Sequence, residues 1–168
     1  RSQGNLSEAE ANYRKCIEAY IILDYKHGIA ICLNNIALIK YSTGHTRQAI
    51  TFFNKSMKIS RHLGAVENIA GIYLNFGDIY LDQKEYPLAL NNYTIGLEIY
   101  LKIGWKESVA FSLDRIAKVY EAQNKPEMAL DYFYKSLEIE KELNSKSGIA
   151  RCYSGIGKIL YQQGRSEE

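Results

Sequence analysis

The sequence predicts an all-α fold, a right-handed α-solenoid of antiparallel helix pairs, and three observations support this. First, the 168-residue chain aligns with itself without gaps when it is shifted by 40 residues. Second, small residues recur at fixed positions of this alignment, and third, residues typical of turns recur between the helical segments. A period of this length, kept along the whole chain, is typical of repeats that stack on their neighbours.

Small and aromatic residues mark the recurring positions. The small ones are Ala9, Ala49, Ala89 and Ala129; Ala30, Ala70, Ala110 and Ala150; and Ala37, Gly77, Ala117 and Gly157. An aromatic position holds Tyr13, Phe53, Tyr93 and Phe133. Small residues let two helices approach closely, whereas a phosphate-binding loop needs clustered glycines at a helix start. We therefore interpret Gly77 as a packing residue.

Within each repeat, apolar residues recur at spacings of three and four, which is the helical period. Two helices fit in each unit. The predicted helices cover residues 6–23, 27–42, 46–63, 67–82, 86–103, 107–122, 126–143 and 147–163.

The turns between these helices carry residues that end helices. They are Gly44, Lys84, Asn124 and Gly164 inside the units, and Asp24, Gly64, Gly104 and Asn144 between units. Most are expected to be C-terminal caps because Gly and Asn tolerate the left-handed conformation, with Lys84 as the exception. Pro87 and Pro126 should lie at helix starts. Ser7 and Glu10 have the spacing of a capping box at the first helix.

We expect one repeat array over residues 1–168, taken from a longer protein. Its parts are a partial unit 1–26, the units 27–66, 67–106 and 107–146, and a partial unit 147–168. Residues 1–4 are expected to end an earlier helix. A repeat cannot bury its apolar face alone, so both ends should expose apolar residues and allow self-association. At the C-terminal end these would be Ile156, Ile159 and Leu160.

The composition argues against several classes of function. A net charge of +2 gives no reason to expect nucleic acid or an anionic membrane as a partner. No apolar run approaches the roughly 20 residues of a membrane helix. Three cysteines without a CxxC motif argue against a disulfide framework or a zinc site. We expect reduced thiols, a cytoplasmic location, and no cofactor or metal.

The sequence also gives no pattern for catalysis. His27, His45 and His62 fall at helix ends or turns of separate units, with no carboxylate or cysteine recurring beside them at ligand spacing. Most of the 14 tyrosines occupy recurring apolar positions, which favours core packing over base stacking. We therefore expect no enzyme.

A group of small and aromatic residues resembles the tetratricopeptide repeat pattern. In one unit they are Leu33, Ala37, Gly44, Ala49, Phe53 and Ser56, and in the next Tyr73, Gly77, Tyr80, Tyr86, Ala89 and Tyr93. Each unit is about six residues longer than the usual repeat of ~34, and Arg61, Leu101 and Lys141 replace the proline expected near the end of the second helix. In its longer repeat and its missing proline, the chain is similar to the long-repeat branch of the family, which includes kinesin light chains and the tetratricopeptide regions of bacterial peptide receptors and sensor proteins.

This resemblance implies a superhelix whose first helices line a concave groove that binds peptides. The candidate groove residues are Asn34, Asn35, Asn75, Asp78, Asp114, Arg115, Lys118, Arg151 and Lys158. The side chains of Asn35 and Asn75 each carry a donor and an acceptor, so they could match successive peptide groups of a ligand. The cations Arg115, Lys118, Arg151 and Lys158 should make the C-terminal half more positive and favour acidic residues.

Two functions remain open at this level. We expect a non-enzymatic scaffold that binds an extended peptide or a partner helix in the groove. The alternative is a regulatory or sensory segment of a larger signalling enzyme, such as a histidine kinase or a nucleotide cyclase. A catalytic domain encoded after Glu168 would favour the alternative, and further repeats alone would favour the scaffold.

Overall fold

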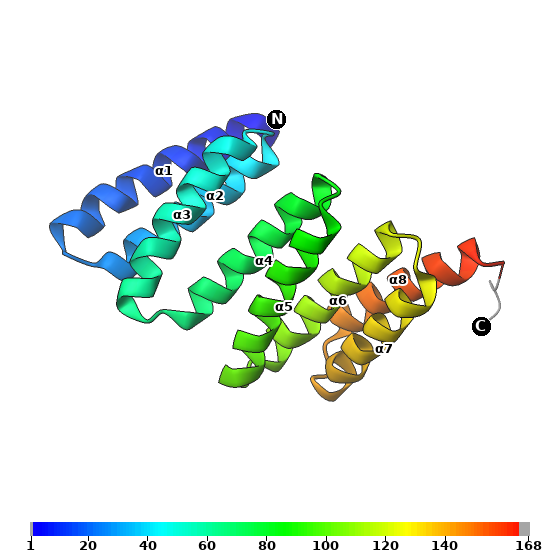
Figure 1. The fold of residues 1–168 in the computed structure, drawn as a ribbon. Helices are drawn as coiled ribbons and strands as arrows, with labels where there is room; N and C mark the ends of the chain where they lie inside the picture. The colour runs from blue at the N-terminus through cyan, green and yellow to red at the C-terminus, as the bar shows by residue number, and fades with distance from the viewer. Residues whose placement is uncertain (1, 165–168) are drawn as a thin grey trace. The chain divides into compact units, whose positions relative to one another are not determined.

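The computed structural model describes the backbone of residues 2–164 and the side chains of residues 5–164, and every regular element in this range is an α-helix. The eight helices are α1 Ser2–Ile22, α2 Lys26–Ser42, α3 Thr46–Leu63, α4 Val66–Asp82, α5 Tyr86–Ile103, α6 Lys106–Ala122, α7 Pro126–Glu142 and α8 Lys146–Gln162 (Figure 1). The first helices of the 40-residue repeats, α2, α4, α6 and α8, start 40 residues apart, as the period predicts.

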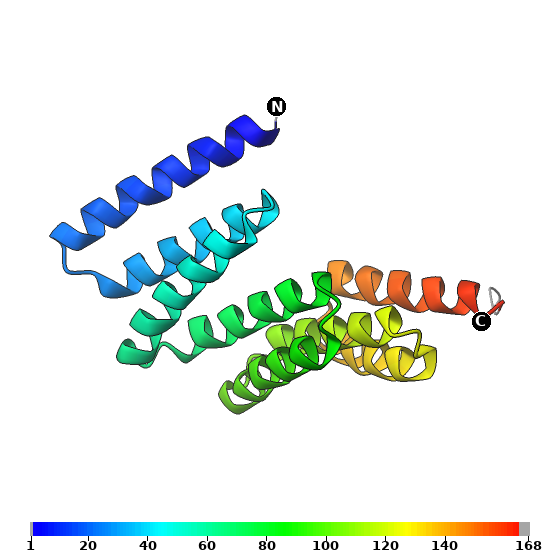
Figure 2. The same ribbon diagram turned by 45° about the horizontal axis from the view of Figure 1, so that its top comes forward.

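The chain divides into two compact parts, Arg1–Ile79 and Tyr80–Glu168, and the division falls near the end of α4. From here on these parts are called the first unit and the second unit, and the 40-residue segments are called repeats. Within each unit, successive helices run antiparallel, as both ribbon views show (Figures 1 and 2). In the first unit α2 packs against both α1 and α3. In the second unit α6 packs against α5 and α7, and α7 against α8.

Each unit has its own core, built from the recurring positions. The first contains Ala37, Ala49, Phe53, Met57, Ile72 and Ile79. The second contains Ala117, Ala129, Phe133, Leu137, Cys152, Ile156, Ile159 and Leu160. Serine joins the helices of a pair in the same way in both units, because the hydroxyl of Ser56 donates to the carbonyl of Ala30 at 2.7 Å, and that of Ser136 donates to Ala110 at 2.8 Å.

All eight predicted turn residues adopt the left-handed conformation, with φ between 47° and 79°. Lys84 does so as well, with φ 61°, although its side chain makes this conformation unfavourable. The position in the repeat therefore decides the conformation, and the residue type only decides its cost. Pro126 is the first residue of α7 and Pro87 the second of α5, as predicted.

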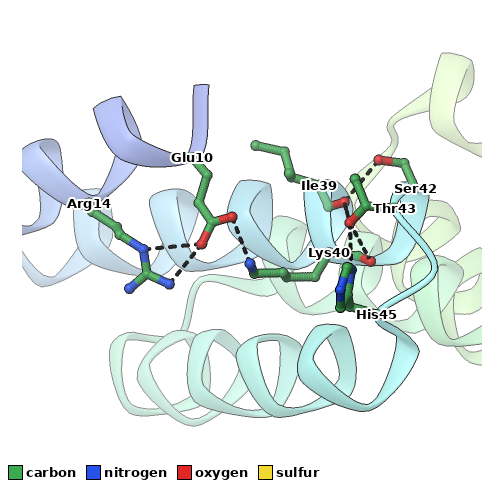
Figure 3. Close-up of polar contacts among 7 residues, drawn as sticks. All are labelled: Glu10, Arg14, Ile39, Lys40, Ser42, Thr43 and His45. Carbon is green, nitrogen blue, oxygen red and sulfur yellow. Dashed lines mark hydrogen bonds and ion pairs between the residues drawn. The ribbon is translucent and has the colours of Figure 1, made fainter. Parts of the chain in front are cut away.

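The predicted start of the first helix is wrong. α1 is continuous from Ser2, so residues 2–4 do not end an earlier helix and Ser7 is not an N-cap; Arg1 lies outside the described residues. Glu10 instead binds Arg14 one turn on at 2.8 Å and Lys40 of α2 at 2.7 Å (Figure 3). A capping box is a short local pattern, and here a contact with the next helix uses the glutamate instead.

The Glu10 contact has a measurable electrostatic consequence. Burial by itself would raise the pKa of the Glu10 carboxyl. Lys40 and Arg14 outweigh burial and hold this pKa below its ordinary value of 4.5. The ionised carboxylate therefore stabilises the packing of α1 on α2.

The expected exposure of Ile156, Ile159 and Leu160 is also wrong, because all three are buried in the core of the second unit. These residues lie on the face of α8 that turns toward α7. The large apolar side chains exposed on α8 are Tyr153 and Tyr161, and an atom added at Gly157 would meet nothing within 4 Å. Ile21 and Ile22 at the end of α1 are exposed, as is Leu23 in the turn that follows.

Candidate functional site

In the first unit, the candidate surface is formed by three amides and one carboxylate. Asn34 and Asn35 lie half-buried on α2, and Asn75 and Asp78 lie half-buried on α4. The Nδ2 of Asn75 donates to the Oδ1 of Asn34 at 3.2 Å, so one amide pair already joins the two first helices. Of these predicted residues, the structure brings Asn34 and Asn75 into direct contact.

In the second unit, the same positions build an ion-pair network around a buried carboxylate. Asp114 on α6 is completely buried, with Lys118 Nζ at 2.7 Å from its Oδ2 and Arg151 Nε at 3.5 Å from its Oδ1. Arg151 Nη2 also donates to Glu140 Oε1 of α7 at 2.6 Å. Asp114 therefore orients two cations from beneath the surface and does not itself reach a ligand.

A second carboxylate holds the remaining cation. Lys158 Nζ lies 2.5 Å from Glu121 Oε1, and about two thirds of the Lys158 side chain is exposed. Four cations of this surface thus stand beside three carboxylates, those of Asp114, Glu121 and Glu140. These three carboxylates reduce the charge of the four cations to a net charge of plus one.

Two arginines share one aromatic ring on this surface. The guanidinium of Arg115 lies 4.7 Å from the centre of the Phe111 ring, and that of Arg151 lies 5.5 Å from it. Cations at such distances are attracted to the face of the ring. Phe111 therefore helps to fix the direction of both side chains.

An open cavity of about 720 Å³ lies beside these cations. Its lining combines the apolar side chains of Leu81, Tyr86 and Ala122 with charged side chains of both signs, which are Asp82, Lys84, Lys118, Glu121 and Lys158. Polar and charged groups in a hollow can fix the orientation of a ligand group that enters it. Periodicity did not indicate this apolar lining, because Leu81 and Tyr86 lie near the end of α4 and at the start of α5, and only the fold brings them beside α6 and α8.

A smaller cavity of about 250 Å³ is lined by Phe133, Arg151, Ser154 and Gly155, among others. Gly155 replaces the asparagine of the first unit, and a Cβ placed there would meet the Phe133 ring at 2.5 Å. The Phe133 ring therefore occupies the space that a side chain at position 155 would need. The asparagine position of Asn35 and Asn75 is held in the second unit by Arg115 and Gly155, so no amide pair of this kind continues there.

The described residues show no group of three His, Cys, Asp or Glu side chains placed to hold a metal ion. The ring of His45 contacts the hydroxyl of Thr43 at 3.1 Å in the turn after α2 (Figure 3). Within residues 2–164, no helix is long and apolar enough to cross a membrane.

Comparison with known proteins decides the family. A family model described as tetratricopeptide repeat matches residues 1–62, 68–142 and 109–168. The chain belongs to the tetratricopeptide repeat family. The recurring small residues and the antiparallel helix pairs are thus those of tetratricopeptide units, here with a period of 40 residues.

Three solved structures show the same fold at low sequence identity. BtubC (BKLC) from P. vanneervenii matches 96% of this chain and 69% of its own, with 20% identity and a TM-score of 0.80. Aspartyl phosphate phosphatase F from Bacillus subtilis matches 98% of this chain and 45% of its own, with 18% identity and a TM-score of 0.86. The N-terminal domain of stress-induced protein-1 (STI-1) from C. elegans matches 77% of this chain and 96% of its own, with 14% identity and a TM-score of 0.58.

No curated protein matches the sequence. The tetratricopeptide repeat chain shares its fold with the three solved structures.

Proposed function

We propose that this tetratricopeptide repeat chain is a non-enzymatic scaffold that binds protein segments in extended form on the faces of its first helices. The observation that carries the proposal is the open cavity of about 720 Å³ in the second unit, whose lining combines apolar residues, partly exposed lysines and the carboxylates of Asp82 and Glu121. A cavity of this composition can hold a peptide side chain and orient its polar groups.

In the first unit, the amides would bind the ligand backbone. An asparagine side chain offers donors and an acceptor, so Asn35 and Asn75 can pair with peptide groups regardless of the ligand sequence. The bond between Asn75 and Asn34 uses only part of their capacity, because each amide has two donor hydrogens and an acceptor oxygen. This surface would give affinity without much specificity.

In the second unit, the cations would favour acidic ligands, but moderately. A ligand carboxylate has to compete with Glu121 for Lys158, and Lys118 is already held by Asp114. Lys158 is the best placed for exchange, because its side chain is mostly exposed. We therefore expect a preference for acidic residues that depends on salt without being dominated by charge.

The amide contacts can be tested by selecting peptides from a library on the purified chain and measuring their binding by calorimetry. The double variant Asn35→Ala with Asn75→Ala should weaken binding about tenfold, which corresponds to about 1.4 kcal/mol. The matched control is Asn54→Ala with Asn91→Ala, which removes two exposed asparagines from second helices and should leave affinity unchanged. Equal affinity in all three proteins would exclude the amides from the site.

The cation contacts need a separate measurement. Lys158→Gln should lower affinity for an acidic peptide and reduce the loss of affinity between low and high salt, because one charge pair is removed. Lys146→Gln, at the exposed start of α8, is the control for charge alone. The same salt dependence in Lys158→Gln and wild type would remove Lys158 from the site.

The alternative, a regulatory segment of a larger signalling enzyme, stays a prediction. Sequencing the complete gene would test it, since a catalytic domain in the same chain would support it.

A further inference from the structure

Two cysteines occupy facing positions on α1 and α2. The repeat relates Cys16 and Cys32 to Ser136 and Cys152, each pair being exactly three periods apart in sequence. In the second unit this pair is in contact, because the Sγ of Cys152 donates to the Oγ of Ser136 at 3.4 Å. The repeat therefore places two sulfur atoms opposite each other in the first unit.

Contacts on both sides of the cysteines support this placement. One helical turn further along α1, Tyr20 meets Gly28 of α2, where an added Cβ would lie 2.7 Å from the tyrosine ring. Toward the other end, Glu10 reaches Lys40. Because the two helices run antiparallel, Cys16 and Cys32 lie between these two contacts, one turn before Tyr20 and one turn after Gly28.

The proximity of Cys16 also affects the pKa of the buried Cys32 thiol. The pKa of the Cys32 thiol is raised, first by burial and then by the adjacent Cys16 thiol. The two thiols are free in the structure, and Cys16 is exposed whereas Cys32 is 5% exposed. An oxidant can thus reach one member of the pair directly.

We propose that Cys16 and Cys32 form a reversible disulfide that ties α1 to α2 under oxidising conditions. A disulfide needs an S–S distance of about 2.05 Å, so a pair at the separation seen between Ser136 and Cys152 has to approach by a little over 1 Å. Rotation of the two side chains supplies such a shift. The site is distinct from the peptide surface, and it does not depend on the proposed function.

The oxidant named here is a low-molecular-weight disulfide such as oxidised glutathione. The Cys16 thiolate attacks one of its sulfurs, a mixed disulfide forms, and the first glutathione leaves as a thiolate. The Cys32 thiolate then attacks the Cys16 sulfur and displaces the second glutathione. Two protein thiols lose their protons and two electrons, and one oxidised glutathione becomes two reduced glutathiones.

The experiment treats the reduced chain with oxidised glutathione, blocks remaining thiols with an alkylating reagent and measures intact mass and peptide maps. We expect a product that has lost two hydrogens and carries one alkyl group, on Cys152, with the Cys16 and Cys32 peptides joined. Closing a loop of this length should raise the melting temperature by several degrees, and a reducing agent should reverse the shift.

Variants distinguish the steps. In the Cys32→Ser variant, the reaction with oxidised glutathione should stop at the glutathione adduct of Cys16. The matched control combines Cys32→Ser with Ile31→Cys, which moves the thiol to an exposed neighbouring position of α2 and should abolish the internal link. A wild-type chain that keeps glutathione on Cys16 while Cys32 is alkylated would overturn the proposal. Disulfide-linked dimers in place of the internal link would overturn it as well.

Discussion

The two units use one repeat position in opposite ways. In the first unit this position is Asn34, whose carbonyl accepts a neutral hydrogen bond from Asn75. In the second unit it is Asp114, a fully buried carboxylate beside Lys118 and Arg151. The same backbone register thus supports a neutral amide pair in one unit and a charge network in the other.

This difference has an energetic meaning. A neutral hydrogen bond between half-buried amides contributes about 0.5–1.5 kcal/mol, and its loss leaves groups that water can reach. A buried carboxylate that loses its cation is left with an uncompensated charge, which is far more costly. Replacing a half-buried amide of this chain should therefore cost little, whereas the buried charge of Asp114 ties α6 to α8 through Arg151.

A second pair of repeat positions shows how the charge was accommodated. In the first unit Asn68 of α4 donates to Ser60 of α3 at 2.6 Å. In the second unit the serine is replaced by Glu140 and the asparagine by Gly148, so the larger residue faces the smaller one. The volume is balanced across the helix pair, which is the usual condition for a close-packed interior.

The largest expected effect comes from removing the shared cation. Arg151→Met should lower the free energy of unfolding by about 3 kcal/mol, the low end for a broken buried pair, because the arginine side chain is 32% exposed. Asn75→Ala, which breaks the amide pair of the first unit, should cost about 1 kcal/mol. Urea denaturation followed by circular dichroism compares the two. Equal losses would mean that the charge network is no stronger than the amide pair.

A smaller effect tests the glycine opposite Glu140. Gly148→Ala should destabilise by about 1–3 kcal/mol, because its methyl group would collide with a carboxylate that is buried and tied to Arg151. Gly157→Ala, in the same helix, should stabilise by up to about 1 kcal/mol, because the added methyl meets no neighbour and alanine favours a helix. Thermal melts of both variants suffice. If the two changes had the same sign, the volume balance would not explain Gly148.

The smallest effect concerns the ion pair of the first unit. The pKa of Glu10 is lowered in the folded chain, so its contribution is complete above the ordinary value of 4.5 and disappears as pH falls through the lower folded pKa. Glu10→Gln should therefore cost less than about 1 kcal/mol at pH 7 and nothing in strong acid. Melting temperatures measured from pH 7 down to pH 3 check this, with Glu18→Gln as the control for charge on α1. A constant difference at all pH values would contradict the assignment.

The architecture could be read from the sequence because its signals are local and repeated. Proline at a helix start and glycine or asparagine at a helix end act within one turn of the chain. Seven of the eight helices begin and end within one residue of the predicted bounds. The first helix was the exception, since Ser7 and Glu10 matched a local signal that a contact with Lys40 overrides.

The surface could be predicted only in part. Periodicity identified Asn34, Asn75, Asp114 and Arg151 as neighbours on first helices, but it did not show which of them are buried. It did not pair Arg151 with Glu140, because Glu140 belongs to a second helix and differs from the other residues at its repeat position. The burial of Ile159 was missed for a similar reason, since the face that a neighbouring helix covers depends on how the pair is packed.

The sequence by itself therefore determined the helices, their period and the tetratricopeptide repeat fold, because the interactions responsible span a few residues and recur every 40. Only the tertiary structure decided how charges are paired, which apolar faces are covered, and where a cavity opens. Those properties depend on atoms from three or four helices meeting at distances of a few ångströms. Ångström-scale differences in helix packing decide whether a cation faces a carboxylate or a ligand, and a repeat pattern does not record them.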